Sequence, residues 1–77
     1  MLQHARDVLA RRAIPVDWVE RALTAPEAVE SDRVDFELEH RLLRILEAGN
    51  RVVRVIVNRA STPQRVVTAF FDRRVTL

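Results

Sequence analysis

The sequence has no cysteine and no lysine, and it contains one glycine among 77 residues. Without cysteine the chain forms no disulfide and has no thiol chemistry or cysteine-based metal site. A single glycine excludes the glycine-rich phosphate loops and the nucleophile elbow. The chain also has no apolar run near the about 20 residues of a membrane span, and no signal-peptide pattern at its start. We therefore predict a cytoplasmic protein that does not enter a membrane.

The remaining composition is that of a small globular protein. Hydrophobic residues make up 48% and charged residues 31% of the chain, which is ordinary for a soluble domain. We predict one domain over residues 1–77 with a thin core, because a chain this short buries only about 60–65% of its unfolded surface. Its two histidines lack a metal-ligand spacing, so we expect no metal and no cofactor.

Charge is divided unevenly along the chain. Residues 48–77 carry six arginines and one acid (6 − 1 = +5), whereas residues 20–39 carry two arginines and seven acids (2 − 7 = −5). A basic segment beside an acidic one indicates a surface that meets an anion such as phosphate. All thirteen basic residues are arginine, which either codon bias or the bidentate binding of phosphate explains. The absence of lysine alone does not decide between them.

Apolar periodicity predicts two short helices, over residues 3–12 and 16–24, separated by Pro15 and ended by Pro26. Two strands follow near the C-terminus, over residues 51–58 and 65–72. In the first, the apolar face is Val53, Val55 and Val57, and the opposite face is Val52, Arg54, Ile56 and Asn58. In the second, the apolar face is Val67, Ala69 and Phe71, and the mixed face is Val66, Thr68, Phe70 and Asp72.

Residues 28–47 fit two patterns. Alternation of Phe36, Leu38, His40 and Leu42 with charged residues is typical of a strand. A helix over residues 37–47 is slightly favoured by pattern alone, because Leu38, Leu42, Ile45 and Leu46 also recur at helical spacing and Glu, Leu and Arg are strong helix formers.

Arg54 and the two histidines are the candidate catalytic residues. Arg54 lies among valines and isoleucine, where a charge costs free energy unless it is paired or solvated. It either pairs with an acid such as Asp72 or Glu39, or stabilises charge on a phosphate group. His4 and His40 are either ordinary polar residues or the group that moves a proton near Arg54. The sequence does not show whether these side chains meet.

Further candidates for binding a substrate are polar residues of the two C-terminal strands. Thr68 is either a common strand residue or a hydroxyl that contacts phosphate. Arg73 is either a solvated strand end or one of the arginines that follow a nucleic-acid backbone. Arg51 and Asn58 flank Arg54 on its own strand and complete this set of candidate residues.

Several runs of residues resemble a small bacterial domain-of-unknown-function family of the DUF4258 type. In the N-terminal half they are His4-Ala5, Arg12-Ala-Ile-Pro15, Trp18-Val-Glu20 and Pro26. In the C-terminal half they are Leu38-Glu-His40, Ile45, Gly49, Arg51-Val-Val-Arg54-Val, Asn58, Pro63 and Val66-Val-Thr-Ala-Phe-Phe-Asp-Arg73. Pro15 departs from the pattern, because relatives often have a serine-like helix cap there.

The resemblance implies an α+β fold similar to the RelE, ParE and BrnT toxins of bacterial toxin–antitoxin pairs. Two N-terminal helices would pack on one face of a twisted, mainly antiparallel sheet of three or four strands. It favours a strand over residues 37–47, with a bulge near Leu42-Leu43 where the apolar face switches. The relation to toxins is one of fold, so for function it is an analogy.

Two functions remain open. One is a metal-independent ribonuclease, in which His4 or His40 handles the proton and Arg54, helped by Arg51, stabilises the transition-state charge. The other is a binding module that holds RNA, an antitoxin or another protein on the open sheet face without chemistry. A homodimer is compatible with both. The position of the two histidines relative to Arg54 and Thr68 is the observation that separates these hypotheses.

Overall fold

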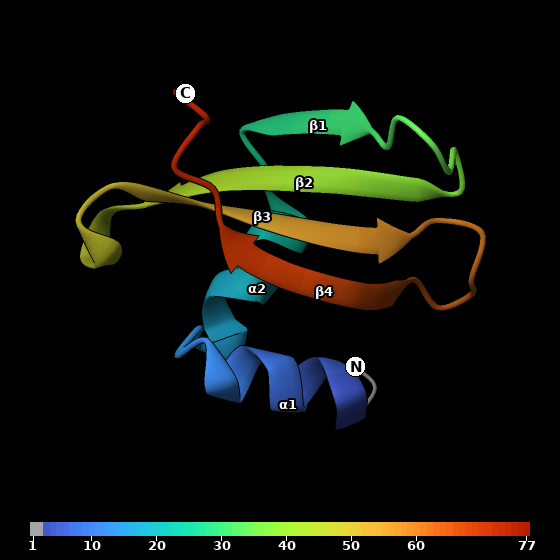
Figure 1. The fold of residues 1–77 in the computed structure, drawn as a ribbon, viewed down its shortest axis with the longest axis horizontal. Coiled ribbons are helices and arrows are strands. Elements are labelled where there is room, and N and C mark those ends of the chain that lie inside the picture. Colours follow the sequence, from blue (N-terminus) through green and yellow to red (C-terminus); the bar gives the residue numbers. More distant parts are fainter. Residues whose placement is uncertain (1–2) are drawn as a thin grey trace.

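The computed structural model describes residues 3–77, with side chains from Ala5 onward. Two helices precede an antiparallel four-stranded sheet, which confirms the predicted α+β class, and the strands follow one another in the order β1-β2-β3-β4 (Figure 1). Within the described residues, no helix is long and apolar enough to cross a membrane. The elements are α1 (Gln3–Arg11), α2 (Val16–Thr24), β1 (Ala28–Ser31), β2 (Leu38–Ile45), a 3-10 turn (Leu46–Ala48), β3 (Arg51–Asn58) and β4 (Arg65–Phe71).

Both helices pack on the same face of the sheet, since buried residues of α1 and α2 share one core with Val53, Val55 and Val57. Pro15 occupies the N-cap of α2, where its missing N–H is no loss because the first helical N–H groups have no intrahelical partner. The face of α2 that carries Val19 and Ala22 is fully buried, and this helix packs against β2 and β3 while α1 packs against β4. The two short helices therefore depend on the sheet for their stability.

Strand β2 resolves the ambiguous segment in favour of a strand. Its ladder with β3 runs without a register shift from the Leu38–Asn58 pair to the Ile45–Arg51 pair, and β1 pairs along its other edge. This pairing on two sides outweighs the helical propensity of the segment. The bulge predicted near Leu42-Leu43 was wrong, since those two apolar side chains face opposite sides of a regular strand.

The irregularity lies instead between β3 and β4, at Ile56 and Val57. It places Val66 opposite Val57 and buries Val66 in the core, while Val67 is left 39% exposed. The predicted faces of β4 were therefore wrong at these two positions, because an extra residue in one strand reverses the direction of the side chains that follow. From Thr68 onward the alternation is as predicted.

The two faces of the sheet have different surroundings. Val53, Val55 and Val57 of β3 point toward the helices and are completely buried. The opposite face, here called the open face, carries Arg54 of β3 directly between Leu42 of β2 and Phe70 of β4. Residues 72–77 run across one end of this face (Figure 1), where the Asp72 N–H donates to the carbonyl of Val52 and Arg44 donates to the carbonyl of Leu77.

Candidate functional site

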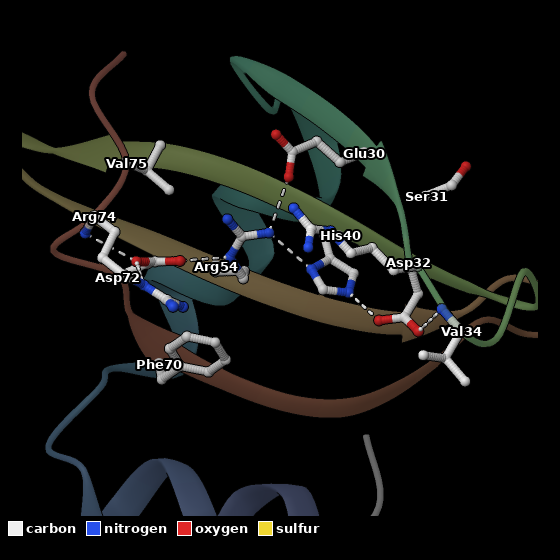
Figure 2. Close-up of a pocket in the computed structure, with 11 residues that line it drawn as sticks. Glu30, Ser31, Asp32, Val34, His40, Arg54, Phe70, Asp72, Arg74 and Val75 are labelled. Atoms are coloured by element: carbon white, nitrogen blue, oxygen red, sulfur yellow. Dashed lines mark hydrogen bonds and ion pairs between the residues drawn. The ribbon is translucent and has the colours of Figure 1, made fainter.

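A cleft of about 740 Å³ lies on the open face of the sheet. Four elements form it: the end of β1 with the loop that follows, β2, β3, and the end of β4 with the tail. Arg54 lies near its centre, with Asp72 on one side and His40 on the other (Figure 2). The lining residues are Glu30, Ser31, Asp32, Arg33, Val34, His40, Arg54, Phe70, Asp72, Arg74 and Val75.

Arg54 makes three hydrogen bonds in this cleft. Its Nε donates to Asp72 Oδ2 at 2.9 Å, and its Nη1 lies 3.0 Å from Glu30 Oε1 and 2.8 Å from His40 Nδ1. The third nitrogen, Nη2, has no hydrogen-bond partner among the described residues. Every buried side-chain nitrogen or oxygen among the described residues has a hydrogen-bond partner. Nη2 has none, so it is not buried and is accessible to solvent. The guanidinium group is thus anchored on one side and free at one nitrogen.

Asp72 is the buried anchor of Arg54. Its side chain is only 2% exposed, and its second oxygen, Oδ1, accepts the backbone N–H of Arg74 at 3.0 Å. That backbone N–H and the guanidinium groups of Arg54 and Arg74 hold the pKa of Asp72 below its ordinary value, against the opposing effect of burial. The carboxylate therefore stays ionised, as a buried partner of an arginine must be.

Asp32 orients His40 from the other side. His40 Nε2 lies 2.7 Å from Asp32 Oδ1, while Asp32 Oδ2 accepts the backbone N–H groups of Val34 and Asp35. The Asp35 N–H, then the His40 ring, then the Val34 N–H lower the pKa of Asp32. An ionised carboxylate can only accept, so Nε2 is the donor in this pair.

The partners of His40 also determine what its other nitrogen does. Arginine can only donate a hydrogen bond, so Nδ1 accepts from Arg54 Nη1. The ring is therefore the neutral tautomer with its proton on Nε2. Asp32, His40, Arg54 and Asp72 form one continuous chain of hydrogen bonds across the open face. Such a chain fixes a proton acceptor, Nδ1, next to a cation.

The structure brings together two of the predicted catalytic residues, His40 and Arg54. The side chain of His4 lies outside the described residues. Of the predicted substrate-binding residues, Arg51 is on the covered face with its guanidinium 4.0 Å above the ring of Phe71. It therefore does not stand beside Arg54, as the sequence-based mechanism required.

The other predicted substrate-binding residues lie outside the cleft. Thr68 is on the open face, but its hydroxyl accepts a hydrogen bond from Arg12 at 3.2 Å. Asn58 uses its side-chain oxygen to accept the Ala60 N–H in the turn after β3. Arg73 is exposed in the tail and does not line the cleft.

The sequence did not identify Glu30 and Asp32 as members of the site. Of the two acids proposed to pair with Arg54, Asp72 does so, but Glu39 instead contacts Arg41 and Arg59. Glu39 was wrong because alternation along β2 turns it to the face opposite His40. Glu30 reaches Arg54 through the β1–β2 register, in which Glu30 stands opposite His40. Its only signal in the sequence is its membership of the acidic segment.

The comparison with protein families gives one match. The model of the domain of unknown function DUF4258 matches residues 1–71, which include every strand of the sheet. The chain belongs to the DUF4258 family. No curated protein and no solved structure gave a significant match. In this DUF4258 domain the matched region contains Glu30, Asp32, His40 and Arg54, while Asp72 follows directly after it.

Among the residues whose side chains are described, no three histidine or acidic side chains are arranged to hold a metal ion. The acids of the cleft are instead engaged by arginine, histidine or backbone N–H groups. The contacts of the cleft are hydrogen bonds and ion pairs centred on His40 and Arg54.

Proposed function

We propose that this DUF4258 domain is a toxin-like ribonuclease that cleaves RNA without a metal ion, with His40 as proton acceptor and Arg54 as the group that binds the phosphate. The observation that carries the proposal is the chain Asp32–His40–Arg54–Asp72 in an open cleft. It fixes one histidine tautomer by a carboxylate and anchors one arginine while leaving its Nη2 free. An oriented base beside an anchored cation is what phosphodiester cleavage requires.

In the proposed reaction the ribose 2′-hydroxyl loses its proton to His40 Nδ1 and its oxygen attacks the adjacent phosphorus. The bond from phosphorus to the 5′-oxygen breaks, and that oxygen takes a proton from water. His40 then returns its proton to water, so the products are a 2′,3′-cyclic phosphate and a free 5′-hydroxyl. Arg54 stabilises the charge on the phosphate oxygens, and Asp32 stabilises the imidazolium ion.

The hydrogen bond between Arg54 and His40 has to be broken by the substrate before His40 can accept a proton. Nδ1 accepts from Nη1 before RNA binds, so the phosphate must draw Nη1 away before the base can act. The same guanidinium group then neutralises the phosphate that displaced it. The resemblance of the sequence to RelE-type toxins supports this reaction class as an analogy of fold.

The test compares two single substitutions in the presence of a metal chelator. His40→Ala removes the proposed base, which we expect to lower the rate of RNA cleavage about 10²- to 10⁴-fold. Arg65→Ala removes an exposed arginine outside the cleft and should leave the rate nearly unchanged. Circular dichroism of both variants checks that the fold is intact. Equal rates for wild type and His40→Ala would remove His40 from the mechanism.

A second candidate function is the binding of a protein partner without chemistry. The observation that favours it is apolar exposure around the cleft: Val34 is 92% exposed, Phe36 on the same loop is 75% exposed, and Phe70 lines the cleft. Aromatic side chains are common anchors of protein interfaces. The test of this second function adds Phe70→Ala to these variants. Phe70→Ala would then weaken partner binding, while His40→Ala left it unchanged. The ribonuclease proposal expects His40→Ala to have the larger effect, on cleavage.

A further inference from the structure

We propose that Glu30 is a displaceable counter-ion of Arg54, and that the phosphate group of the ligand takes its place. This inference rests on the proposed function, since it concerns how the same site admits its substrate. It assigns a role to an acid that neither the family match nor the proposed reaction uses. An acid that faces the substrate's position normally repels phosphate, so its presence requires an explanation.

The two carboxylates on Arg54 differ strongly in exposure. Asp72 is 2% exposed and contacts Nε, whereas Glu30 is 56% exposed and contacts Nη1. Removing the partner of a buried charge is costly, but an exposed ion pair contributes little and exchanges readily with solvent. Of the two contacts, the one with Glu30 is therefore the one that an incoming anion can replace while Asp72 keeps its contact with Nε.

The geometry of the guanidinium group favours an oxyanion at the same position. Nη1 and Nη2 together form the edge of arginine that binds two oxygens of a phosphate in parallel. Glu30 occupies only Nη1, and Nη2 has no described hydrogen-bond partner. A phosphate group can therefore use both nitrogens where Glu30 uses one, and in doing so it draws Nη1 away from His40 Nδ1. Displacement of Glu30 would thus couple phosphate binding to release of the proposed base.

The experiment measures the affinity of a 2′-O-methyl RNA oligonucleotide, which cannot be cleaved by the proposed reaction, and separately that of inorganic phosphate. Glu30→Gln should bind the oligonucleotide about two- to fivefold more tightly than wild type, the range set by a weak exposed ion pair. Glu37→Gln is the matched control, because it removes the same charge from an exposed position outside the cleft. Its affinity should stay close to that of wild type. In an Arg54→Lys background, Glu30→Gln should give a much smaller gain.

Each outcome decides the proposal. Tighter binding of both probes by Glu30→Gln would show that the site binds phosphate itself, and tighter binding of the oligonucleotide alone would show a preference for the phosphate of a nucleic-acid strand. Both results support displacement. Unchanged or weaker binding by Glu30→Gln, or an equal gain in Glu37→Gln, would overturn it. If wild type cleaves RNA while Glu30→Gln gives no gain, only this inference fails; if no variant binds or cleaves RNA, the proposed function fails with it.

Discussion

The two faces of the sheet differ in the residues they carry: one is apolar and buried, and the other holds charged and polar side chains. Toward the helices, β3 presents Val53, Val55 and Val57, all completely buried in an apolar core. On the open face the same strand presents Arg54, which is only 13% exposed and is held by a chain of charged and polar side chains. Alternation along a single strand therefore separates the residues that stabilise the fold from those that can do chemistry.

The open face is where the arrangement of residues lowers the stability of the fold. Burying an ion pair is often no better for stability than packing apolar residues of similar volume. The open face nevertheless holds Arg54 against the buried Asp72 in a domain whose core is already thin. A cost of this kind is common at binding and catalytic sites, where charged groups must be fixed in advance. This cost in stability is the reason why we propose that the functional site lies on the open face.

The largest expected effect on stability comes from substituting Asp72 on the open face. Asp72→Ala leaves the partly buried Arg54 without its buried partner, so the free energy of unfolding should fall by about 3 kcal/mol. This loss equals or exceeds that of a core truncation such as Val55→Ala, expected at about 2 kcal/mol. Urea unfolding of the two variants gives both values.

The control for this substitution is Arg74→Ala. Arg74 also contacts Asp72, at 3.4 Å, but its side chain is 88% exposed, so its loss should change the free energy of unfolding by less than about 0.5 kcal/mol. If Asp72→Ala were as mild as Arg74→Ala, the open face would carry no buried ion pair of consequence.

A smaller effect is expected on acidification. The pKa values of Asp32 and Asp72 in the folded chain lie below the ordinary 3.8, so the unfolded chain takes up protons first as the pH falls. Their contribution to stability is then complete above about pH 5 and is lost as the pH falls through 4 and below. Urea unfolding at several pH values should show this decline, and Asp32→Asn should make it shallower. An equally steep decline in Asp32→Asn would contradict the contribution of Asp32.

The smallest effect is expected at Arg73, a predicted substrate-binding residue that lies outside the cleft. Arg73→Ala should change the free energy of unfolding by less than about 0.5 kcal/mol and reduce RNA affinity only slightly, through the loss of one charge. Affinity measured at low and moderate salt checks this. A loss as large as that of an Arg54 substitution would show that the tail, and not the open face, carries the ligand.

Local patterns in the sequence predicted most of the fold. Apolar periodicity predicted α2 and β3 with the observed bounds, because both segments have one clearly apolar face. It could not decide residues 37–47, since β2 is defined by partners on both edges and not by its own pattern. The bulge beside Val66 was missed because it depends on how β4 aligns with β3, and a sequence does not state that register.

The site was predictable only in part for the same reason. Arg54 was identified because a charge among valines is unusual, and Asp72 was correctly proposed as one of its partners. His40 was a candidate as one of two histidines, but its neighbours were unknown. Glu30 and Asp32 reach the site through the β1–β2 hairpin, whose pairing decides which acids of the acidic segment face Arg54. No sequence motif predicts that pairing of strands.

The most direct test of the proposed ribonuclease uses a substrate changed at one atom. A short RNA carrying a single 2′-deoxy nucleotide at the cleavage position is compared with the all-ribose strand, in a metal chelator, and the products are identified by mass. The proposal predicts a 2′,3′-cyclic phosphate from the all-ribose strand and no cut at the deoxy position, because the attacking oxygen is missing. Equal cleavage of the two strands, or no cleavage of either, would contradict it.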